Sequence, residues 1–319
     1  MEQKKPLVSH IFTADPSAHV FEDKIYVYPS HDSDKDFVSK DDGSQYMMED
    51  YHVLRIDDLD APAVDCGEAI HMKDIPWVRQ QLWAPDAAYV NGKYYLIFPA
   101  KDKDLIFRIG VAEGDRPEGP FAAHESWIPG SYSVDPAVFV EDGKVYLLFG
   151  GLWGGQLEQW QTGEYVAGAP GPSGDEKALG PKIVELTTDF KAMKEEPKEI
   201  VILGKDGQPI PAGDEEKRFF EGGWIHKYNG KYYLSYSTGS THLLVYATSD
   251  NIYGPYTFGG TFLTPVIGWT THHSIVEFKG KWFLFYHDAS LSGADSKRCV
   301  KVTELTYAED GSIVTIDPY

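Results

Sequence analysis

Four ionisable side chains recur at nearly the same place in four repeated segments of this 319-residue chain. Asp15, Asp135 and His272 each begin such a segment, and Glu221 stands one residue earlier in its own. If the segments stack around a common axis, three carboxyls and an imidazole meet at one end of it. Two carboxyls on opposite sides of a sugar ring can cleave a glycosidic bond, one as the acid and the other as base or nucleophile. A third carboxylate can keep the acid protonated through repulsion between like charges.

Each of these residues also has a structural interpretation. Asp15 and Asp135 precede proline, and Asp-Pro is common in turns. His272 could be a hydrogen-bonded core residue, and His273 remains an alternative for its position. Glu221 lies among aromatic residues and glycines, where an unpaired carboxylate is costly to bury. Recurrence in register favours the functional interpretation, in which an axial imidazole binds a cation or orients a carboxylate.

Three further residues are candidates for binding a sugar. Arg298 precedes the last expected strand and offers a guanidinium to hydroxyls and carboxylates, although a surface position fits it equally well. Trp83 and Trp153 are candidate aromatic platforms, with core packing as the alternative. Glycines on both sides of Trp153 favour an exposed loop there. Asp86 lies two positions beyond the register of the other acids, so we expect it to be structural.

The repeated segments are typical of β-hairpins, because each has an apolar run, a turn on Gly or Asp before Lys, and an aromatic strand. They are 15–26, 84–95, 135–146, 221–233 and 272–283. Further strands are expected at 106–112, 183–186, 243–248 and 300–305, and weak helical periodicity appears only near 188–195. The inserts 159–180 and 198–217 are either solvated loops or walls of a cleft. Irregular repeats of roughly 40–50 residues favour an all-β five-bladed β-propeller with about four strands a blade, as one domain over residues 1–319.

The composition argues against several classes of partner. A net charge of −20 disfavours nucleic acid and anionic membranes, because both require a basic surface. No run approaches the ~18 apolar residues of a membrane span. The first ten residues lack a signal-like apolar run, so the protein is expected to be cytoplasmic, or exported with its signal absent from this numbering. Cys66 and Cys299, the only cysteines, are expected to be free thiols.

In this order, the motifs resemble glycoside hydrolase family 43, whose members are five-bladed β-propellers. The matching pieces, spread over nearly the whole chain, are Ala14-Asp-Pro-Ser17, Trp83-Ala-Pro-Asp86, Val134-Asp-Pro136, Glu221-Gly222 and His272–Ser274. The resemblance implies an inverting reaction with Asp15 as general base, Glu221 as general acid and Asp135 as the residue that tunes and orients the acid. Base and acid carboxyls would then lie about 6.5–9.5 Å apart.

The resemblance also implies a cofactor and further contacts. His272 matches the family's axial histidine, which in many members contacts a calcium ion or its waters, so calcium is the expected cofactor. A single histidine among waters is an unusual calcium site, because calcium prefers oxygen ligands. Arg298 matches the family's active-site arginine. The C-terminal β-sandwich of some members has no counterpart in this sequence.

The implied substrates are xylo- and arabino-oligosaccharides, and the sugars are hard to distinguish because one hydroxymethyl group is worth only about 1–3 kcal/mol. Long inserts and the aromatic loop at Trp153 favour a closed pocket. The expected activity is therefore that of an exo-acting β-xylosidase with α-L-arabinofuranosidase activity. Two alternatives stay open. An endo-acting arabinanase or xylanase would need an open groove, and a non-catalytic sugar-binding propeller would not require three carboxyls in register.

Overall fold

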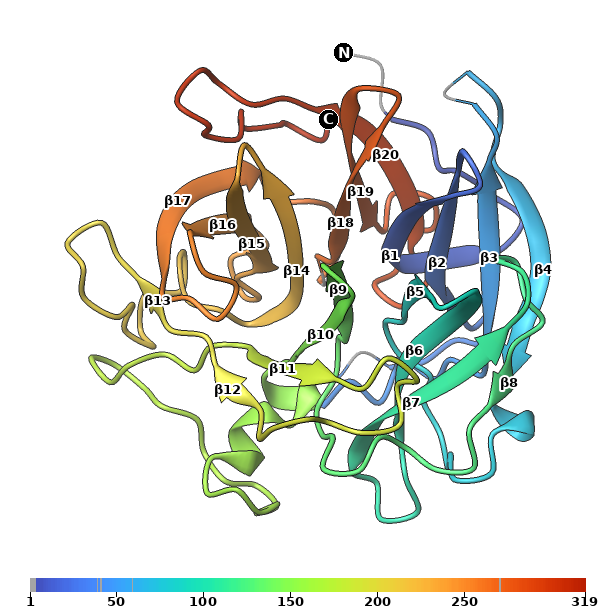
Figure 1. Cartoon of the computed structure of the whole chain (residues 1–319), viewed down its shortest axis with the longest axis horizontal. Helices are drawn as coiled ribbons and strands as arrows, with labels where there is room; N and C mark the ends of the chain where they lie inside the picture. The colour runs from blue at the N-terminus through green and yellow to red at the C-terminus, as the bar shows by residue number, and fades with distance from the viewer. Residues whose placement is uncertain (1–3, 39, 41, 59, 270) are drawn as a thin grey trace.

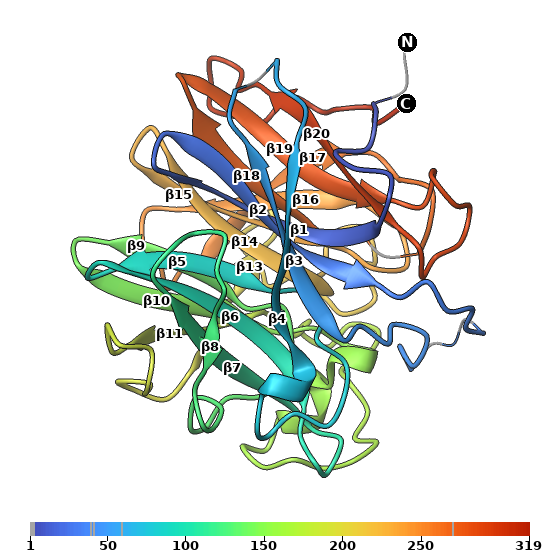
Figure 2. The same cartoon turned by 90° about the vertical axis from the view of Figure 1, so that its right-hand side faces the viewer.

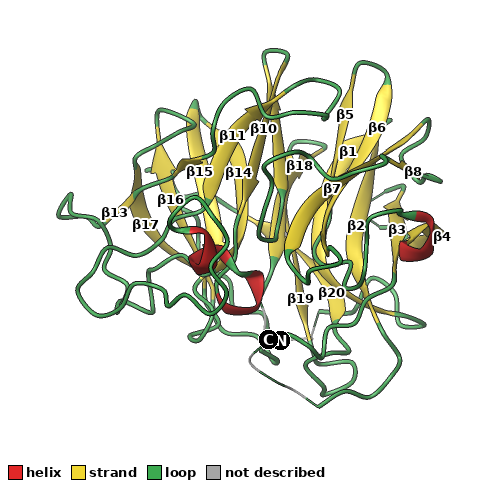
Figure 3. Ribbon diagram, turned by 90° about the horizontal axis from the view of Figure 1, so that it is seen from below, coloured by secondary structure: helices red, strands yellow, loops and turns green. Residues whose placement is uncertain are grey.

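The computed structural model describes residues 4–38, 40, 42–58, 60–269 and 271–319. Its strands form five sheets around a central axis, and Figure 1 looks along that axis. The prediction of an all-β five-bladed β-propeller is therefore confirmed. The innermost strands are β1 (Phe12–Phe21), β5 (Asp86–Val90), β9 (Ala137–Glu141), β14 (Glu221–Tyr228) and β18 (His273–Phe278). Figures 2 and 3 show the blades from the side.

The first three blades each have four antiparallel strands, as expected. Blade 1 continues through β2 (Lys24–Asp32), β3 (Asp50–Ile56) and β4 (Val64–His71); blade 2 through β6 (Lys93–Lys101), β7 (Phe107–Gly114) and β8 (Ala122–Ala123); blade 3 through β10 (Lys144–Phe149), β11 (Lys182–Leu186) and β12 (Lys198–Glu199). In the described part of the chain, three short 3₁₀ helices lie between strands: η1 (Met72–Asp74), η2 (Trp153–Gly155) and η3 (Leu157–Trp160).

The last two blades depart from four strands. Blade 4 adds β15 (Lys231–Ser237), β16 (Leu244–Ser249) and β17 (Tyr256–Leu263), and β13 (Ile202–Leu203) pairs with β17 in parallel as a fifth strand. Blade 5 has only β18, β19 (Lys281–Asp288) and β20 (Cys299–Leu305) among the described residues. Beside β20, the backbone N–H of Leu7 donates to the carbonyl of Val300 at 2.8 Å. The first described residues thus cover the edge of the last blade.

The helical periodicity near 188–195 is misleading. This stretch forms a turn in which Phe190 has a left-handed backbone (φ 58°) and Leu186 bridges to Met193. The hydroxyl of Thr187 donates to the Asp189 carboxylate at 2.6 Å. Local side-chain hydrogen bonds of this kind compete with helix formation and favour turns.

The predicted hairpin turns are all present, and each is a two-residue turn. Both residues of every turn have positive φ, the geometry of the turns that match strand twist. The five pairs are Glu22-Asp23, Asn91-Gly92, Asp142-Gly143, Asn229-Gly230 and Lys279-Gly280. Because these turns close one end of the inner hairpins, the starts of the inner strands gather at the other end.

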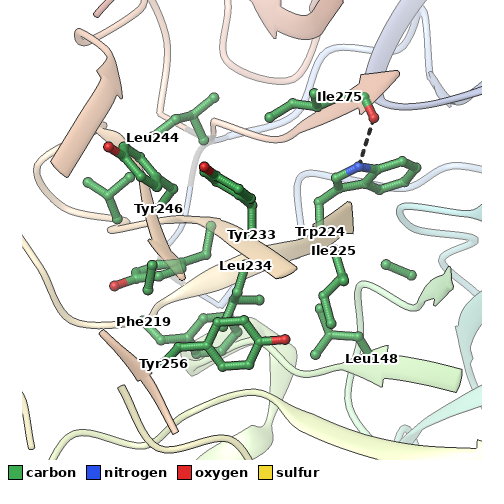
Figure 4. Packing of buried hydrophobic residues seen from close by; sticks show 14 of the residues in the cluster. Leu148, Phe219, Trp224, Ile225, Tyr233, Leu234, Leu244, Tyr246, Tyr256 and Ile275 are labelled. Atoms are coloured by element: carbon green, nitrogen blue, oxygen red, sulfur yellow. Dashed lines mark hydrogen bonds between the residues drawn. The ribbon is translucent and has the colours of Figure 1, made fainter. Parts of the chain in front are cut away.

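Aromatic packing joins neighbouring blades. In the cluster of Figure 4, Phe219, Tyr233, Tyr246 and Tyr256 are buried around β14 and β15. Trp224 of β14 donates its indole N–H to the carbonyl of Ile275 in β18 at 3.0 Å. This bond satisfies a buried donor and fixes the spacing of blades 4 and 5.

Asp86 is structural, as its position outside the register predicted. Its side chain is fully buried, with Oδ1 2.6 Å from Nε2 of His19 in blade 1 and Oδ2 accepting the backbone N–H of Val138 in blade 3 at 2.5 Å. One carboxylate therefore ties three blades together. Cys66 and Cys299 are free thiols. Within the described ranges, no helix has the length and apolar character needed to cross a membrane.

Candidate active site

The structure brings all seven predicted site residues to one pocket. It encloses about 600 Å³, open solvent at its mouth included. The predicted residues that line it are Asp15, Trp83, Asp135, Trp153, Glu221, His272 and Arg298. Lys40, Gly43, Gln45, Tyr46, Met48, Phe220 and Trp269 also contribute to its walls. Asp135, Glu221 and His272 lie at or just before the starts of inner strands, and Asp15 is the fourth residue of β1. All four are therefore near the end opposite the hairpin turns.

Strand pairing confirms the register of the repeats. Asp15, Asp135, Gly222 and His272 each lie two residues before equivalent paired positions. Glu221 therefore stands one residue earlier than the others, as its sequence offset indicated. Asp15, Asp135 and Gly222 have left-handed backbones (φ 47°, 55° and 65°), and β1 and β14 carry bulges there. Such bulges re-aim side chains at the ends of strands.

Glycine at position 222 permits a close approach. A Cβ there would lie 2.4 Å from Cδ2 of His272, and its positive φ also disfavours a side chain. Its backbone N–H donates to Oδ2 of Asp135 at 2.9 Å. The residue next to Glu221 thus connects the acid, Asp135 and the imidazole.

Asp15 is held in its ionised form. Arg298 donates from Nη1 to Oδ1 at 3.1 Å, and the Ser30 hydroxyl donates to Oδ2 at 2.7 Å. Nδ1 of His272 lies 3.6 Å from Oδ1. Burial by itself raises the pKa of Asp15, but Arg298 and the nearby histidines outweigh it and hold the pKa well below its usual range. Asp15 is therefore an anion at neutral pH.

The carboxyls of Asp135 and Glu221 have raised pKa values, in contrast to Asp15. Burial is the main cause that raises the pKa of Asp135 to about 6, and the negative charge of Asp15 adds to it. Burial and then the charge of Asp135 raise the pKa of Glu221 to about 8. Because the two groups interact, the proton is held by the pair, chiefly at Glu221 near neutral pH. One pocket thus contains an ionised carboxylate and a protonated carboxylic acid.

Arg298 is buried, so the interpretation as a surface residue is wrong. Its Nε and Nη2 donate to the two oxygens of Asp32 at 2.9 and 2.7 Å. Asp32 is only 1% exposed and was not identified from the sequence. This two-pronged contact fixes the plane of the guanidinium and points Nη1 at Asp15.

Ser30 and His287 also escaped the sequence interpretation. Nδ1 of His287 accepts the backbone N–H of Asp15 at 2.9 Å. The sequence does contain a signal for Asp32 and His287. A His-Asp pair ends the second strand in both the first and the fifth blade, at His31-Asp32 and His287-Asp288. Comparing second strands as well as first strands would have found it.

His272, rather than His273, faces the pocket. His273 is buried with its Nε2 2.6 Å from the Ser235 hydroxyl, and it is not among the lining residues. Burial lowers the pKa of His272, but the charges of Asp135 and Asp15 outweigh it and raise the pKa above its usual value. The two aspartates therefore stabilise positive charge at this position.

The surroundings of His272 do not form a cage of protein ligands for calcium. Among the described residues, only one group of three or more His, Cys, Asp or Glu side chains has its ligand atoms within 4.8 Å of one another. That group is His31, Asp50 and His52, outside this pocket. Calcium takes about six to eight oxygen ligands. His272 could therefore hold calcium only as one nitrogen ligand in a shell made mainly of water.

The two predicted tryptophans differ in their surroundings. Trp153 is 43% exposed and stacks on Trp269, with ring centroids 6.0 Å apart. Trp83 donates its indole N–H to the carbonyl of Tyr46 at 2.8 Å and packs on Phe107. Both rings line the pocket, and only Trp153 presents a large free face. The insert 159–180 does not line this pocket; part of it borders a neighbouring hollow that shares Trp153.

The sequence model of the family "Glycosyl hydrolases family 43" matches residues 3–313 of this chain. The chain belongs to this family. It is 57% identical to xylosidase/arabinosidase 43A of Humicola insolens, over 98% of this chain and 99% of that protein. It is 51% identical to a xylosidase/arabinosidase of Bacteroides ovatus, over 99% and 98% of the two chains.

A solved structure with the same fold adds a ligand to the comparison. CoXyl43, a family 43 β-xylosidase/α-arabinofuranosidase from a compost microbial metagenome, was crystallised with xylotriose in a calcium-free form. It superposes with a TM-score of 0.97 at 56% identity, over 100% of this chain and 98% of that one. The resemblance to family 43 enzymes of the xylosidase/arabinosidase type is therefore confirmed.

Proposed function

We propose that this chain is an inverting exo-glycosidase that releases xylose and L-arabinose from xylo- and arabino-oligosaccharides. Asp15 is the general base, Glu221 the general acid, and Asp135 the residue that keeps the acid protonated. The observation that carries the proposal is the difference in proton affinity within one pocket: Arg298 keeps Asp15 ionised, while burial and Asp135 raise the pKa of Glu221 to about 8.

The strands that carry the two groups suit this reaction. β1 and β14 lie on different sides of the central axis, so Asp15 and Glu221 approach the pocket from different blades. Asp15 takes a proton from a water molecule as that water attacks the anomeric carbon, and Glu221 gives its proton to the leaving oxygen. His272 and Arg298 both contact the carboxylate of Asp15 and hold this base in place. Trp153 supplies an apolar face for a sugar ring at the mouth of the pocket.

The sugar specificity is supported by the relatives. Two of them, at 57% and 51% identity over nearly their whole lengths, are xylosidase/arabinosidases. Xylotriose is the ligand bound by CoXyl43. We therefore extend the same substrate class to this chain, with xylose and L-arabinose as the released sugars.

The test is a product assay on a panel of xylo- and arabino-oligosaccharides, with NMR of the first-formed anomer. We expect single pentoses from the start of the reaction and inversion at the anomeric carbon. Long fragments as first products would identify an endo-acting arabinanase or xylanase instead, and retention would contradict the role of Asp15 as base. Binding without turnover would identify a sugar-binding propeller.

Two variants assign the roles. Asp15→Asn should reduce turnover roughly 10²–10⁴-fold on all substrates, because the attacking water loses its base. Glu221→Gln should reduce turnover by a similar factor on natural linkages and by much less on nitrophenyl glycosides, whose leaving groups need little protonation. Asp102→Asn is the matched control, since Asp102 is a buried aspartate bonded to Arg108 and does not line the pocket. Equal losses across leaving groups would remove Glu221 from the acid role.

For calcium, the proposal is limited to a hydrated ion with His272 as its one protein ligand. The support is the donor set described above and the existence of a calcium-free form of CoXyl43. Such an ion would supply positive charge near the aspartates. Calcium added to chelator-treated protein should raise the melting temperature, and His272→Gln should abolish that rise; no shift in the wild-type protein would contradict the site.

A further inference from the structure

A group of histidines and carboxylates lies at one end of blade 1, outside the pocket. His31 is the last residue but one of β2, Asp50 begins β3, and His52 follows two residues later. One ligand atom from each of the three lies within 4.8 Å of the others. Their side chains are between 16% and 23% exposed, so water can reach them. β2 and β3 run side by side in Figures 1 and 2.

The carboxylate of Asp65 fixes the ring of His52 from the other side. Nδ1 of His52 lies 2.9 Å from Oδ1 of Asp65, which requires the proton on Nδ1. In the neutral ring, Nε2 then presents a lone pair toward Oδ2 of Asp50, 3.9 Å away. Two electron-rich atoms face each other at a distance too long for a direct hydrogen bond. A cation between them would satisfy both.

We propose that His31, Asp50 and His52 form a Zn²⁺ site, with Asp65 orienting His52 from behind. Two imidazoles and one carboxylate suit zinc, whereas calcium and magnesium prefer oxygen ligands. A metal-bound histidine typically donates its other ring N–H to a carboxylate, as His52 does to Asp65. The fourth position would be filled by water, which reaches the group through its exposed side.

The distances require only a small adjustment. In a tetrahedral zinc site, ligand atoms are about 3.4 Å apart. The Nε2 of His52 and Oδ2 of Asp50 are close to this, at 3.9 Å. Nδ1 of His31 and Oδ1 of Asp50 are joined by a hydrogen bond of 2.6 Å and would separate by roughly 0.8 Å as zinc replaces the shared proton.

The position of the site suggests what it does. His31 lies two residues before the segment 33–49, and Asp50 follows it directly. Described residues of that segment, including Gln45, Tyr46 and Met48, form a wall of the pocket. A zinc ion would join β2 and β3 where the chain enters and leaves this segment. The site therefore serves to hold the substrate-facing segment in place, at a distance from the reacting groups.

Zinc titration of chelator-treated protein, with a coloured zinc indicator as competitor, tests the proposal. We expect one bound Zn²⁺ per chain in the wild type and loss of that binding in the double variant His31→Gln/His52→Gln. His124→Gln is the matched control, because His124 is a partly buried histidine that faces one glutamate in blade 2, and it should bind zinc as the wild type does. Circular dichroism establishes that each variant is folded.

Two further measurements keep the test decisive. Asp65→Asn removes no ligand, so it should fold and should weaken zinc binding roughly 10–100-fold. His272→Gln should leave zinc binding unchanged. No zinc binding in the wild type, binding that survives in the double variant, or binding that is lost only in His272→Gln would each overturn the proposal, the last by placing the ion in the pocket. These outcomes are independent of glycosidase activity, and they leave the proposed function untouched.

Discussion

The replacement Asp135→Asn probes how this pocket keeps its acid protonated. Burial and then the negative charge of Asp135 raise the pKa of Glu221 from 4.5 to about 8. Asparagine has nearly the same shape and can still accept the backbone N–H of Gly222, so the substitution removes mainly the charge. A neighbouring charge of this kind shifts a pKa by roughly 1–3 units. Since burial remains, we expect the pKa of Glu221 to fall by about 1–2 units, or about 1.4–2.7 kcal/mol.

The assay is the pH dependence of kcat/KM, which reports the ionisation of the free enzyme. Activity requires protonated Glu221, so the alkaline limb should lie near pH 8 in the wild type and move to lower pH in Asp135→Asn. Asp102→Asn, a neutralised buried aspartate outside the pocket, should leave the limb in place. An alkaline limb that stays fixed or moves upward in Asp135→Asn would refute the reasoning, because removal of a negative charge can only make an adjacent acid easier to ionise.

Two other predictions concern the buried charges around the pocket. Asp32→Asn leaves Arg298 with one fewer buried counter-charge, so it should destabilise the fold by roughly 3–5 kcal/mol and lower kcat/KM. Melting curves and kinetics measure both effects. The control is Asp36→Asn, which should change neither, because Asp36 is an exposed partner of Lys297. An unchanged melting temperature in Asp32→Asn would contradict the role given to this pair. Glu221→Gln should melt at a higher temperature than the wild type, and the difference should grow between pH 5 and pH 8. The pKa of Glu221 is 4.5 in the unfolded chain and about 8 in the folded protein, so the free energy of unfolding of the wild type falls as the pH rises through this interval. Glutamine does not ionise and has no such effect. A margin independent of pH would count against the raised pKa of Glu221.

The inner hairpins could be predicted because their determinants are local. A two-residue turn with positive φ at both positions favours residues such as Asn-Gly or Asp-Gly. The strand that follows each turn is short and rich in aromatic residues, which favour strands. Equal spacing from those turns then places Asp15, Asp135 and His272 in one register. The site was visible in the sequence because the repeats carry it in the same place.

The outer strands and the supporting contacts could not be read in this way. β8, β12 and β13 have two residues each, so their pairing depends on the blade beside them rather than on local propensity. The contact between Arg298 and Asp32 joins residues 266 positions apart in the sequence. Only closure of the ring, with blade 5 against blade 1, brings them together, and a pattern within a single repeat contains no information about it.

The one-residue displacement of Glu221 explains how a single repeated motif produces two proton states. At the bulge of blade 4 the aligned position is Gly222, which has no side chain, and its N–H donates to Asp135. That hydrogen bond favours the anion of Asp135, and the anion in turn opposes ionisation of Glu221. Asp15, at the same bulge in blade 1, has Arg298 as its partner and stays ionised. Base and acid therefore differ because one blade places a carboxyl at the bulge, while the other places a backbone donor there and moves its carboxyl back by one residue.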